Sequence, residues 1–152
     1  MYCIRRNVEM VYGRINISQW ADLDNDQDSE VIEDRVNYFI EQAGIMIDSL
    51  LDSSAYSVPF IDPYPDQIVY LTALKAGILL YDGRRVVNDE TENQVSAQEK
   101  QFQSIIGRIL ADTYSLLGVS RKSTKPPKVV KYEDESEAAE NLFDPFREAS
   151  CR

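Results

Sequence analysis

The residues best suited to chemistry in this sequence form an acidic stretch that follows the only tryptophan, Trp20. Oxygen-bearing side chains occupy positions 1, 3, 5, 7, 9 and 12 of a twelve-residue window, the ligand pattern of Ca²⁺-binding loops, and they are Asp22, Asp24, Asp26, Asp28, Glu30 and Glu33. Position 6, where such loops need glycine to turn sharply, is Gln27, and position 8 is Ser29. The pattern therefore leaves two interpretations open, a cation site and a solvated turn that caps the following helix.

Other residue types that carry out chemistry are scarce. The sequence has no histidine, and this removes the commonest general base and the commonest activator of a nucleophile. Its two cysteines, Cys3 and Cys151, lie near opposite ends, so they do not make a disulfide scaffold. Hydrolytic triads are excluded, and we expect neither catalysis nor a cofactor.

The charge and hydropathy of the chain limit its partners and its location. No apolar run approaches the roughly 20 residues of a membrane span, and the first residues carry Arg5, Arg6 and Glu9 where a signal peptide needs an apolar core. With a net charge of -10, the chain lacks the basic surface of a sequence-specific DNA reader. We expect an intracellular protein without membrane contact.

One long amphipathic helix is predicted from Asp28 to Asp52. Its apolar residues recur at intervals of three and four, as on one helix face, and they are Val31, Ile32, Val36, Phe39, Ile40, Ala43, Met46, Ile47, Leu50 and Leu51. Asp28 or Ser29 is expected to cap its start. A helix of this length needs other helices to cover its apolar stripe, so it is the expected spine of a small all-α domain.

Shorter helices are predicted around this spine. A helix over 4–12, with Ile4 on its inner side, is expected to end at Gly13, and a helical turn over 15–21 carries Trp20 into the core. A central buried helix is predicted over 65–81, with Lys75 reaching out to solvent. A last helix over 95–117 is expected to end at Gly118. Residues 1–118 thus read as one domain, a small bundle of three main helices with short N-terminal helical turns.

The loop over 53–66 is the first predicted interaction site. Three prolines within seven residues prevent regular structure, yet the loop is rich in large apolar side chains. Such a surface exceeds what a three-helix monomer hides easily, so we expect part of it at a subunit interface. The predicted partner-binding residues are Tyr56, Phe60, Ile61 and Tyr64.

The composition changes sharply after residue 118. Residues 119–131 hold five bases, no acid and the pair Pro126-Pro127, which predicts an extended basic linker. Residues 132–152 hold seven acids and two bases around an apolar cluster, the pattern of an acidic C-terminal arm that orders on a partner. The predicted anchors of this docking arm are Leu142, Phe143, Pro145 and Phe146. The alternative is a passive solubilising tail.

The order of these features resembles the head-tail connector proteins of tailed bacteriophages, also called adaptor or head-completion proteins. The resemblance covers about residues 2–117. It rests on a short first helix, the Asp-rich turn, a long helix ending in Asp48-Ser49-Leu50-Leu51, the loop Tyr56-Ser57-Val58-Pro59 and an apolar helix ending in Leu80-Tyr81. Each motif is weak alone, and their order carries the resemblance.

The resemblance implies a structural protein of the virion, made in the host cytoplasm, that is not an enzyme. It would form a homo-oligomeric ring, typically of twelve copies, between the portal protein and a tail or neck protein, around the channel through which DNA passes. Contact with that DNA would be non-specific, since an acidic channel does not grip phosphates. The alternative function is that of a small Ca²⁺-binding helical regulatory or interaction protein, which requires the Asp22–Glu33 window to bind the ion.

Overall fold

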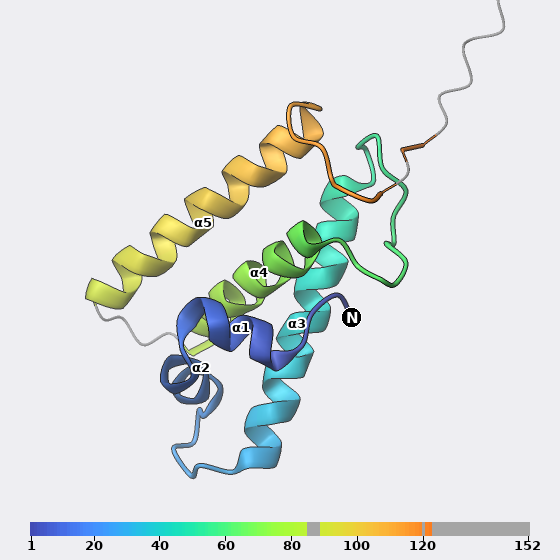
Figure 1. The fold of residues 1–152 in the computed structure, drawn as a ribbon. Coiled ribbons are helices and arrows are strands. Elements are labelled where there is room, and N and C mark those ends of the chain that lie inside the picture. The colour runs from blue at the N-terminus through green and yellow to red at the C-terminus, as the bar shows by residue number, and fades with distance from the viewer. Residues whose placement is uncertain (85–88, 120, 123–152) are drawn as a thin grey trace, which may run out of the picture. The chain divides into compact units, whose positions relative to one another are not determined.

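Helices make up the regular structure of the residues that the computed structural model describes, which are 1–84, 89–119, 121 and 122. In chain order they are α1 (Arg5–Tyr12), α2 (Arg14–Ala21), α3 (Ser29–Leu51), α4 (Asp66–Arg84) and α5 (Asp89–Leu110) (Figure 1). The prediction of an all-α fold is confirmed for these residues. Among the described helices, none combines the length and the apolar composition that crossing a bilayer requires.

The first two helices meet at Gly13, whose φ of 84° favours glycine. Its N–H donates to the Glu9 carbonyl at 2.8 Å and closes α1, as the sequence predicts. Val8 and Tyr12 face the core, but the prediction that Ile4 also points inward is wrong, because its side chain is 61% exposed. Ile4 precedes the helix with an extended backbone, so its side chain does not follow the helical stripe.

The expected core role of Trp20 on α2 is confirmed. Its side chain is buried, and its ring packs edge-to-face against Tyr12 and Tyr81, with centroid distances of 5.4 and 5.3 Å. Edge-to-face packing of this kind adds to the free energy of burial. Trp20 therefore joins α1, α2 and the end of α4.

The long helix α3 begins as the sequence predicts. Asp28 is its N-cap, and one carboxylate oxygen accepts from the N–H groups of Glu30 and Val31 at 2.9 and 3.4 Å. The predicted apolar stripe is only partly buried, since Val31, Met46 and Leu50 are exposed. The neighbouring helices cover one side of α3, and these three residues lie at the edges of the stripe or beyond it.

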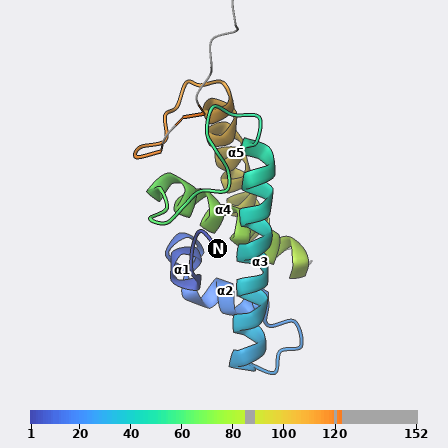
Figure 2. The same cartoon turned by 90° about the vertical axis from the view of Figure 1, so that its right-hand side faces the viewer.

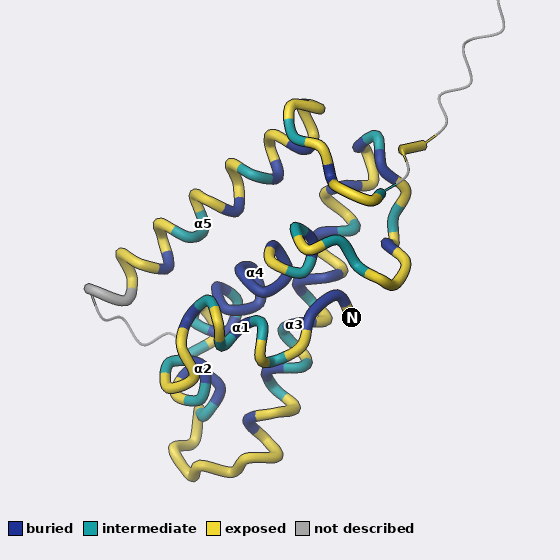
Figure 3. The backbone as a smooth tube through the Cα atoms, in the orientation of Figure 1, coloured by how far each residue is buried: buried dark blue, intermediate teal, exposed yellow. Residues whose placement is uncertain are grey.

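The central helix is α4, which packs against all four other helices. Its residues from Leu71 to Ile78 are buried without interruption (Figure 3). Gly77 is essential to this packing, because a Cβ atom built there would lie 2.1 Å from the Tyr12 ring. The Tyr12 hydroxyl donates to the Leu74 carbonyl at 2.8 Å, which fixes α1 on α4.

The prediction that Lys75 reaches out to solvent is wrong. Lys75 is 8% exposed, and its Nζ lies 3.1 Å from an oxygen of Glu99 and 5.4 Å from the centroid of the Phe102 ring. Both partners belong to α5, which covers this side of α4. A buried ammonium group needs a counter-charge, and Glu99 together with the face of Phe102 provides it.

The last helix is shifted toward the N-terminus relative to the predicted range. It begins at Asp89 and ends at Leu110, well before Gly118. Asp112 has a φ of 55°, its N–H donates to the Ile109 carbonyl, and the N–H of Thr113 donates to the Arg108 carbonyl. These two bonds and the left-handed residue make a Schellman motif, a helix end that aspartate tolerates better than most residues.

The buried side chains form two clusters. The first joins α1 and α2 to the first half of α3 and to α4, and the second joins Tyr2, the 53–65 loop, the end of α3, the start of α4 and α5. Figure 2 shows α1 and α2 beside the early turns of α3 and the 53–65 loop beside its last turns. The compact unit extends from Met1 to Lys122. The rest of the predicted linker and the whole predicted acidic arm lie outside the described residues.

Candidate interaction site

The acidic turn before α3 is organised by its own side chains. Asp22 accepts from the N–H of Gln27 at 3.3 Å, and Asp26 accepts from the N–H of Asp28 at 3.0 Å. Gln27, at the position where a Ca²⁺ loop needs glycine, has a φ of 59° and so takes the conformation that glycine would supply. The backbone therefore turns sharply here without a glycine.

The carboxylates of this turn do not converge. Asp24 and Glu33 are exposed, as are Asp26 and Asp28. In the described part of the chain, no three Asp, Glu, Cys or His side chains lie together as ligands of one metal ion would. The contacts of Asp28 and Asp26 explain the turn as a helix cap, and Ca²⁺ binding stays a prediction.

The proline-rich loop packs mainly on its own chain. Tyr56 and Phe60, predicted to bind a partner, are only 1% and 7% exposed and belong to the second core cluster. Tyr64 is half-buried, whereas Ile61 is 86% exposed. Of these four predicted residues, Ile61 therefore offers the largest exposed apolar surface. It is the residue of the four for which contact with another subunit stays the main prediction.

Tyr2 holds this loop against α3. Its hydroxyl donates to Asp48 and accepts from the Phe60 N–H at 3.0 Å. Its ring packs edge-to-face on Phe60 and Tyr64, with centroid distances of 5.8 and 5.1 Å. Burial, together with the bond to Asp48, raises the pKa of Tyr2 above its ordinary value. We call these contacts of Tyr2 with Asp48, Phe60 and Tyr64 the Tyr2 clasp. Sequence reasoning missed it because a tyrosine at the second position gives no sign of a partner 58 residues away.

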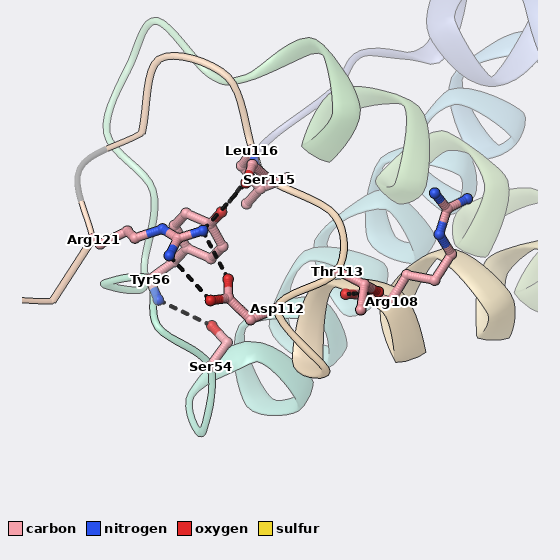
Figure 4. Close-up of polar contacts among 8 residues, drawn as sticks. All are labelled: Ser54, Tyr56, Arg108, Asp112, Thr113, Ser115, Leu116 and Arg121. Carbon is pink, nitrogen blue, oxygen red and sulfur yellow. Dashed lines mark hydrogen bonds and ion pairs between the residues drawn. The ribbon is translucent and has the colours of Figure 1, made fainter.

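A second set of contacts, which we call the latch, joins the loop to the segment after α5 (Figure 4). It consists of Tyr56, Asp112, Leu116 and Arg121. The Leu116 N–H donates to the Tyr56 hydroxyl at 2.9 Å, and the Arg121 guanidinium lies 2.7 Å from Asp112 and 5.8 Å from the centroid of the Tyr56 ring. Tyr56 is thus the buried centre of the latch, and the ion pair covers it from the solvent side.

Backbone contacts extend the latch to the last described residues. Arg121 and Tyr56 form an isolated antiparallel bridge, and the Lys122 N–H donates to the Ala55 carbonyl at 2.6 Å. The Lys122 ammonium also donates to the Asp52 carbonyl at the end of α3. The chain therefore continues toward its C-terminus from a fixed point beside the last turn of α3.

A shallow groove lies between the proline-rich loop and the segment after α5. Its volume is about 240 Å³, and it is lined by Ser57, Pro59, Phe60, Ile61, Pro63, Pro65, Gly118 and Val119. Leu117, the residue before Gly118 in the chain, is 74% exposed. The groove is smaller than the roughly 300–1,000 Å³ of typical ligand pockets, so it suits one or two apolar side chains of a protein partner.

The cysteine in the described part of the chain does not provide a nucleophile. Cys3 is buried, and burial raises the pKa of its thiol to about 12. A thiol with this pKa stays protonated at neutral pH and reacts slowly.

Comparison with known proteins does not place this chain in a family. No family model, curated protein or solved structure matches it. The residues of the chain itself therefore carry the functional argument.

The structure brings together only part of the predicted interaction surface. Tyr56, Phe60 and Tyr64 meet in one cluster with Tyr2, and Ile61 lies at its exposed edge. The predicted anchors of the C-terminal arm lie outside the described residues, and they are Leu142, Phe143, Pro145 and Phe146. Sequence reasoning missed the ion pair of Arg121 and Asp112. The signal that could have revealed it is an acid and a base nine residues apart on either side of a turn.

Proposed function

We propose that this protein is a ring-forming connector of a tailed bacteriophage, which joins the portal protein to a tail or neck protein around the DNA channel. The observation that carries the proposal is the position of the residues that resemble connector proteins. One residue from each of four of these motifs, namely Asp28, Asp48, Tyr56 and Tyr81, makes a contact that caps a helix or joins two elements. The motifs that carry the resemblance therefore also supply contacts that hold the fold together.

Each of these contacts has a physical role. Asp28 caps α3, and Asp48 near its end accepts from Tyr2. Tyr56 accepts from the Leu116 N–H in the latch, and Tyr81 packs on Trp20. Such contacts favour one rigid arrangement, which a subunit repeated around a channel needs.

The charge of the chain suits a passage for DNA. The sequence has 26 acidic and 16 basic residues, which gives a net charge of -10. Binding of DNA phosphates needs cationic side chains that displace counterions, and an acidic ring supplies few of them. Such a ring lets DNA pass without holding it.

The C-terminal arm is proposed to dock on the portal or on the next neck component. Leu142, Phe143 and Phe146 are its apolar anchors, and Pro145 stands between the two aromatic residues in the sequence. Twelve copies of a weakly binding arm would bind strongly together, because the ring raises their effective concentration. A chain truncated after Lys131 is expected to form rings that no longer hold the portal or the neck component, whereas undiminished joining would identify the arm as a passive tail.

Negative-stain electron microscopy of the portal of the same phage, with and without this protein, tests the connector function. We expect an additional ring on one face of the portal, coaxial with its channel. A chain with Tyr56→Asp serves as the control. This change removes the centre of the latch and so disrupts the proline-rich loop. Portal particles that look identical with and without the wild-type chain would contradict the proposal.

A further inference from the structure

The outer side of α3 carries an unusual line of residues. Val31, Tyr38 and Ile45 recur every seven residues and are 45%, 56% and 61% exposed. Asp34, Glu41 and Asp48 fall between and after them at intervals of three and four, so all six lie along one side of the helix. We call these six residues the α3 seam. Because α3 buries Val36, Ile40 and Ile47 on its opposite side, the seam faces away from the core along most of its length. Its last member, Asp48, lies at the inner edge, where it accepts from the Tyr2 hydroxyl.

The charge of α3 limits what the seam can bind. The helix has five acids, Glu30, Glu33, Asp34, Glu41 and Asp48, and one base, Arg35, so its net charge is -4. Two such seams would repel each other, which excludes a symmetric contact of seam with seam. An exposed apolar line flanked by acids suits a partner that presents apolar side chains together with basic ones.

The first two helices present a surface of that kind. Residues 1–21 have three bases, Arg5, Arg6 and Arg14, and one acid, Glu9, so their net charge is +2. Met10 and Ile15 are 77% and 73% exposed, and Arg6 and Arg14 are exposed beside them in the sequence. We call Arg6, Met10, Arg14 and Ile15 the α1–α2 corner.

The corner also offers a depression for an inserted side chain. A groove of about 440 Å³ lies beside it, and its lining includes Arg14 and Ile15 together with Ser18, Gln19 and Ile32. Ile15 and Ile32 are its apolar lining, and its charged lining consists of two bases, Arg5 and Arg14, and one acid, Asp22. A large side chain with an apolar body, such as the exposed Tyr38 of the seam, matches it in size and character.

We propose that the α3 seam of one copy binds the α1–α2 corner of the next copy. The two surfaces belong to one chain but cannot meet within it, because α1 and α2 pack on the buried side of α3. A contact between two different surfaces of identical chains is head-to-tail, and it closes into a ring when the rotation between copies allows. The inference rests on the proposed ring function and identifies the surfaces that build the ring.

Charge reversal with the full chain tests this contact. One variant reverses the corner (Arg6→Glu with Arg14→Glu), and a second reverses the seam (Asp34→Lys with Glu41→Lys). A control variant applies the same change of charge as the corner variant to the exposed face of α5 (Lys100→Glu with Arg108→Glu). Association is measured by sedimentation velocity over a range of concentrations at low salt, and circular dichroism checks that every variant keeps its helices.

We expect the wild type and the control to associate and each reversed variant to associate at least about tenfold more weakly. An equimolar mixture of the two reversed variants should recover association, because each then meets a surface of opposite charge. A chain with all four substitutions should recover it as well. Restoration by mixing is the result that a purely structural effect of the substitutions does not produce.

Four results would overturn the proposal. Association of either reversed variant at wild-type strength would place the contact elsewhere, and loss without recovery on mixing would assign the two surfaces to other partners. A wild-type chain that stays monomeric at every concentration would exclude self-association through these surfaces. Binding of the portal by the reversed variants, with rings of normal size, would leave the connector function intact while removing this interface.

Discussion

At the scale of single residues, the contact between Gly77 and Tyr12 is the most demanding in the first core cluster. A Cβ atom at position 77 would lie between 2.1 and 2.7 Å from three atoms of the Tyr12 ring. That ring cannot move aside freely, because its hydroxyl is bonded to the Leu74 carbonyl and its face meets Trp20. The close approach of α1 to α4 therefore depends on the absence of a side chain here.

We predict that Gly77→Ala lowers the free energy of unfolding by about 1–3 kcal/mol, the usual cost of overpacking a core. Gly107→Ala is the matched control, since nothing lies within 4 Å of the Cβ position there. It should raise the free energy of unfolding by up to about 1 kcal/mol, because alanine favours helix. Urea unfolding measures both, and equal stability of the two variants would show that the Tyr12 ring yields.

The acidic turn gives a second prediction at this scale. Asp24 and Asp26 are exposed, and Asp26 contacts the Asp28 N–H. We therefore expect Asp24→Asn and Asp26→Asn each to lower the free energy of unfolding by about 1 kcal/mol or less, as for solvated charges near a helix start. Thermal unfolding with and without Ca²⁺ is the measurement. A large Ca²⁺-dependent rise in Tm that both changes abolish would instead identify a cation site.

The third residue-scale prediction concerns alkaline pH. The folded state raises the pKa of Tyr2 above the ordinary value of 10.0, chiefly through burial. The stability that depends on the neutral hydroxyl is therefore fully present below about pH 10 and is lost as the pH rises further. Tyr2→Phe should be less stable at pH 7 but should lose less stability between pH 9 and about 11. Urea unfolding across this range is compared with Tyr38→Phe, whose side chain is exposed; equal alkaline slopes in wild type and Tyr2→Phe would refute the assignment.

At the scale of elements, the latch determines how the segment after α5 returns to α3. The Tyr56 hydroxyl accepts a buried backbone N–H, whereas the ion pair of Arg121 and Asp112 is about half exposed on both side chains. A buried donor that loses its acceptor costs free energy, while an exposed ion pair is screened by water and salt. The hydrogen bond to the Tyr56 hydroxyl should therefore contribute more to the free energy of unfolding than the ion pair of Arg121 and Asp112.

We predict that Tyr56→Phe lowers the free energy of unfolding by about 1–3 kcal/mol, because the Leu116 N–H then has no acceptor. Arg121→Ala should lower it by less, and its effect should shrink further in high salt. Urea unfolding at two salt concentrations distinguishes them. A larger loss for Arg121→Ala than for Tyr56→Phe would show that the ion pair dominates the latch.

Local sequence signals predicted most of the elements. Asp28 before a run of apolar residues marked the start of α3, and Gly13 marked the end of α1, because a cap acts on the groups nearest to it. The end of α5 was missed, because Asp112 in a left-handed conformation is much rarer as a helix end than the glycine at position 118. The nearly continuous apolar composition identified α4 as the buried central helix but gave no sign of the Lys75–Glu99 pair, which depends on where α5 lies.

Long-range contacts explain the rest of what sequence reasoning missed. The interface prediction for Tyr56 and Phe60 counted their apolar surface correctly, but the latch and the Tyr2 clasp cover that surface within the chain. The residues that cover Tyr56 and Phe60 are distant from them in sequence, so no local pattern predicts these contacts. The exposed Ile61 and Leu117 remain as apolar surface around the same groove.

At the scale of the whole molecule, the proposed ring contacts use two different surfaces of one helical subunit. The α3 seam is acidic and apolar, the α1–α2 corner is basic and apolar, and α1 and α2 pack on the buried side of α3. The groove beside Ile61 and the chain beyond Lys122 start from the other end of α3. Contacts around a ring and contacts along its axis would then use separate parts of the subunit.

Native mass spectrometry of the full chain, alone and bound to the portal of the same phage, tests the ring most directly. We expect one closed species whose mass is a fixed integer multiple of the 17.4 kDa chain, with twelve copies on the portal. Open-ended or variable copy numbers would contradict a closed ring. A spectrum that contains only the single chain, with and without the portal, would contradict the proposed ring.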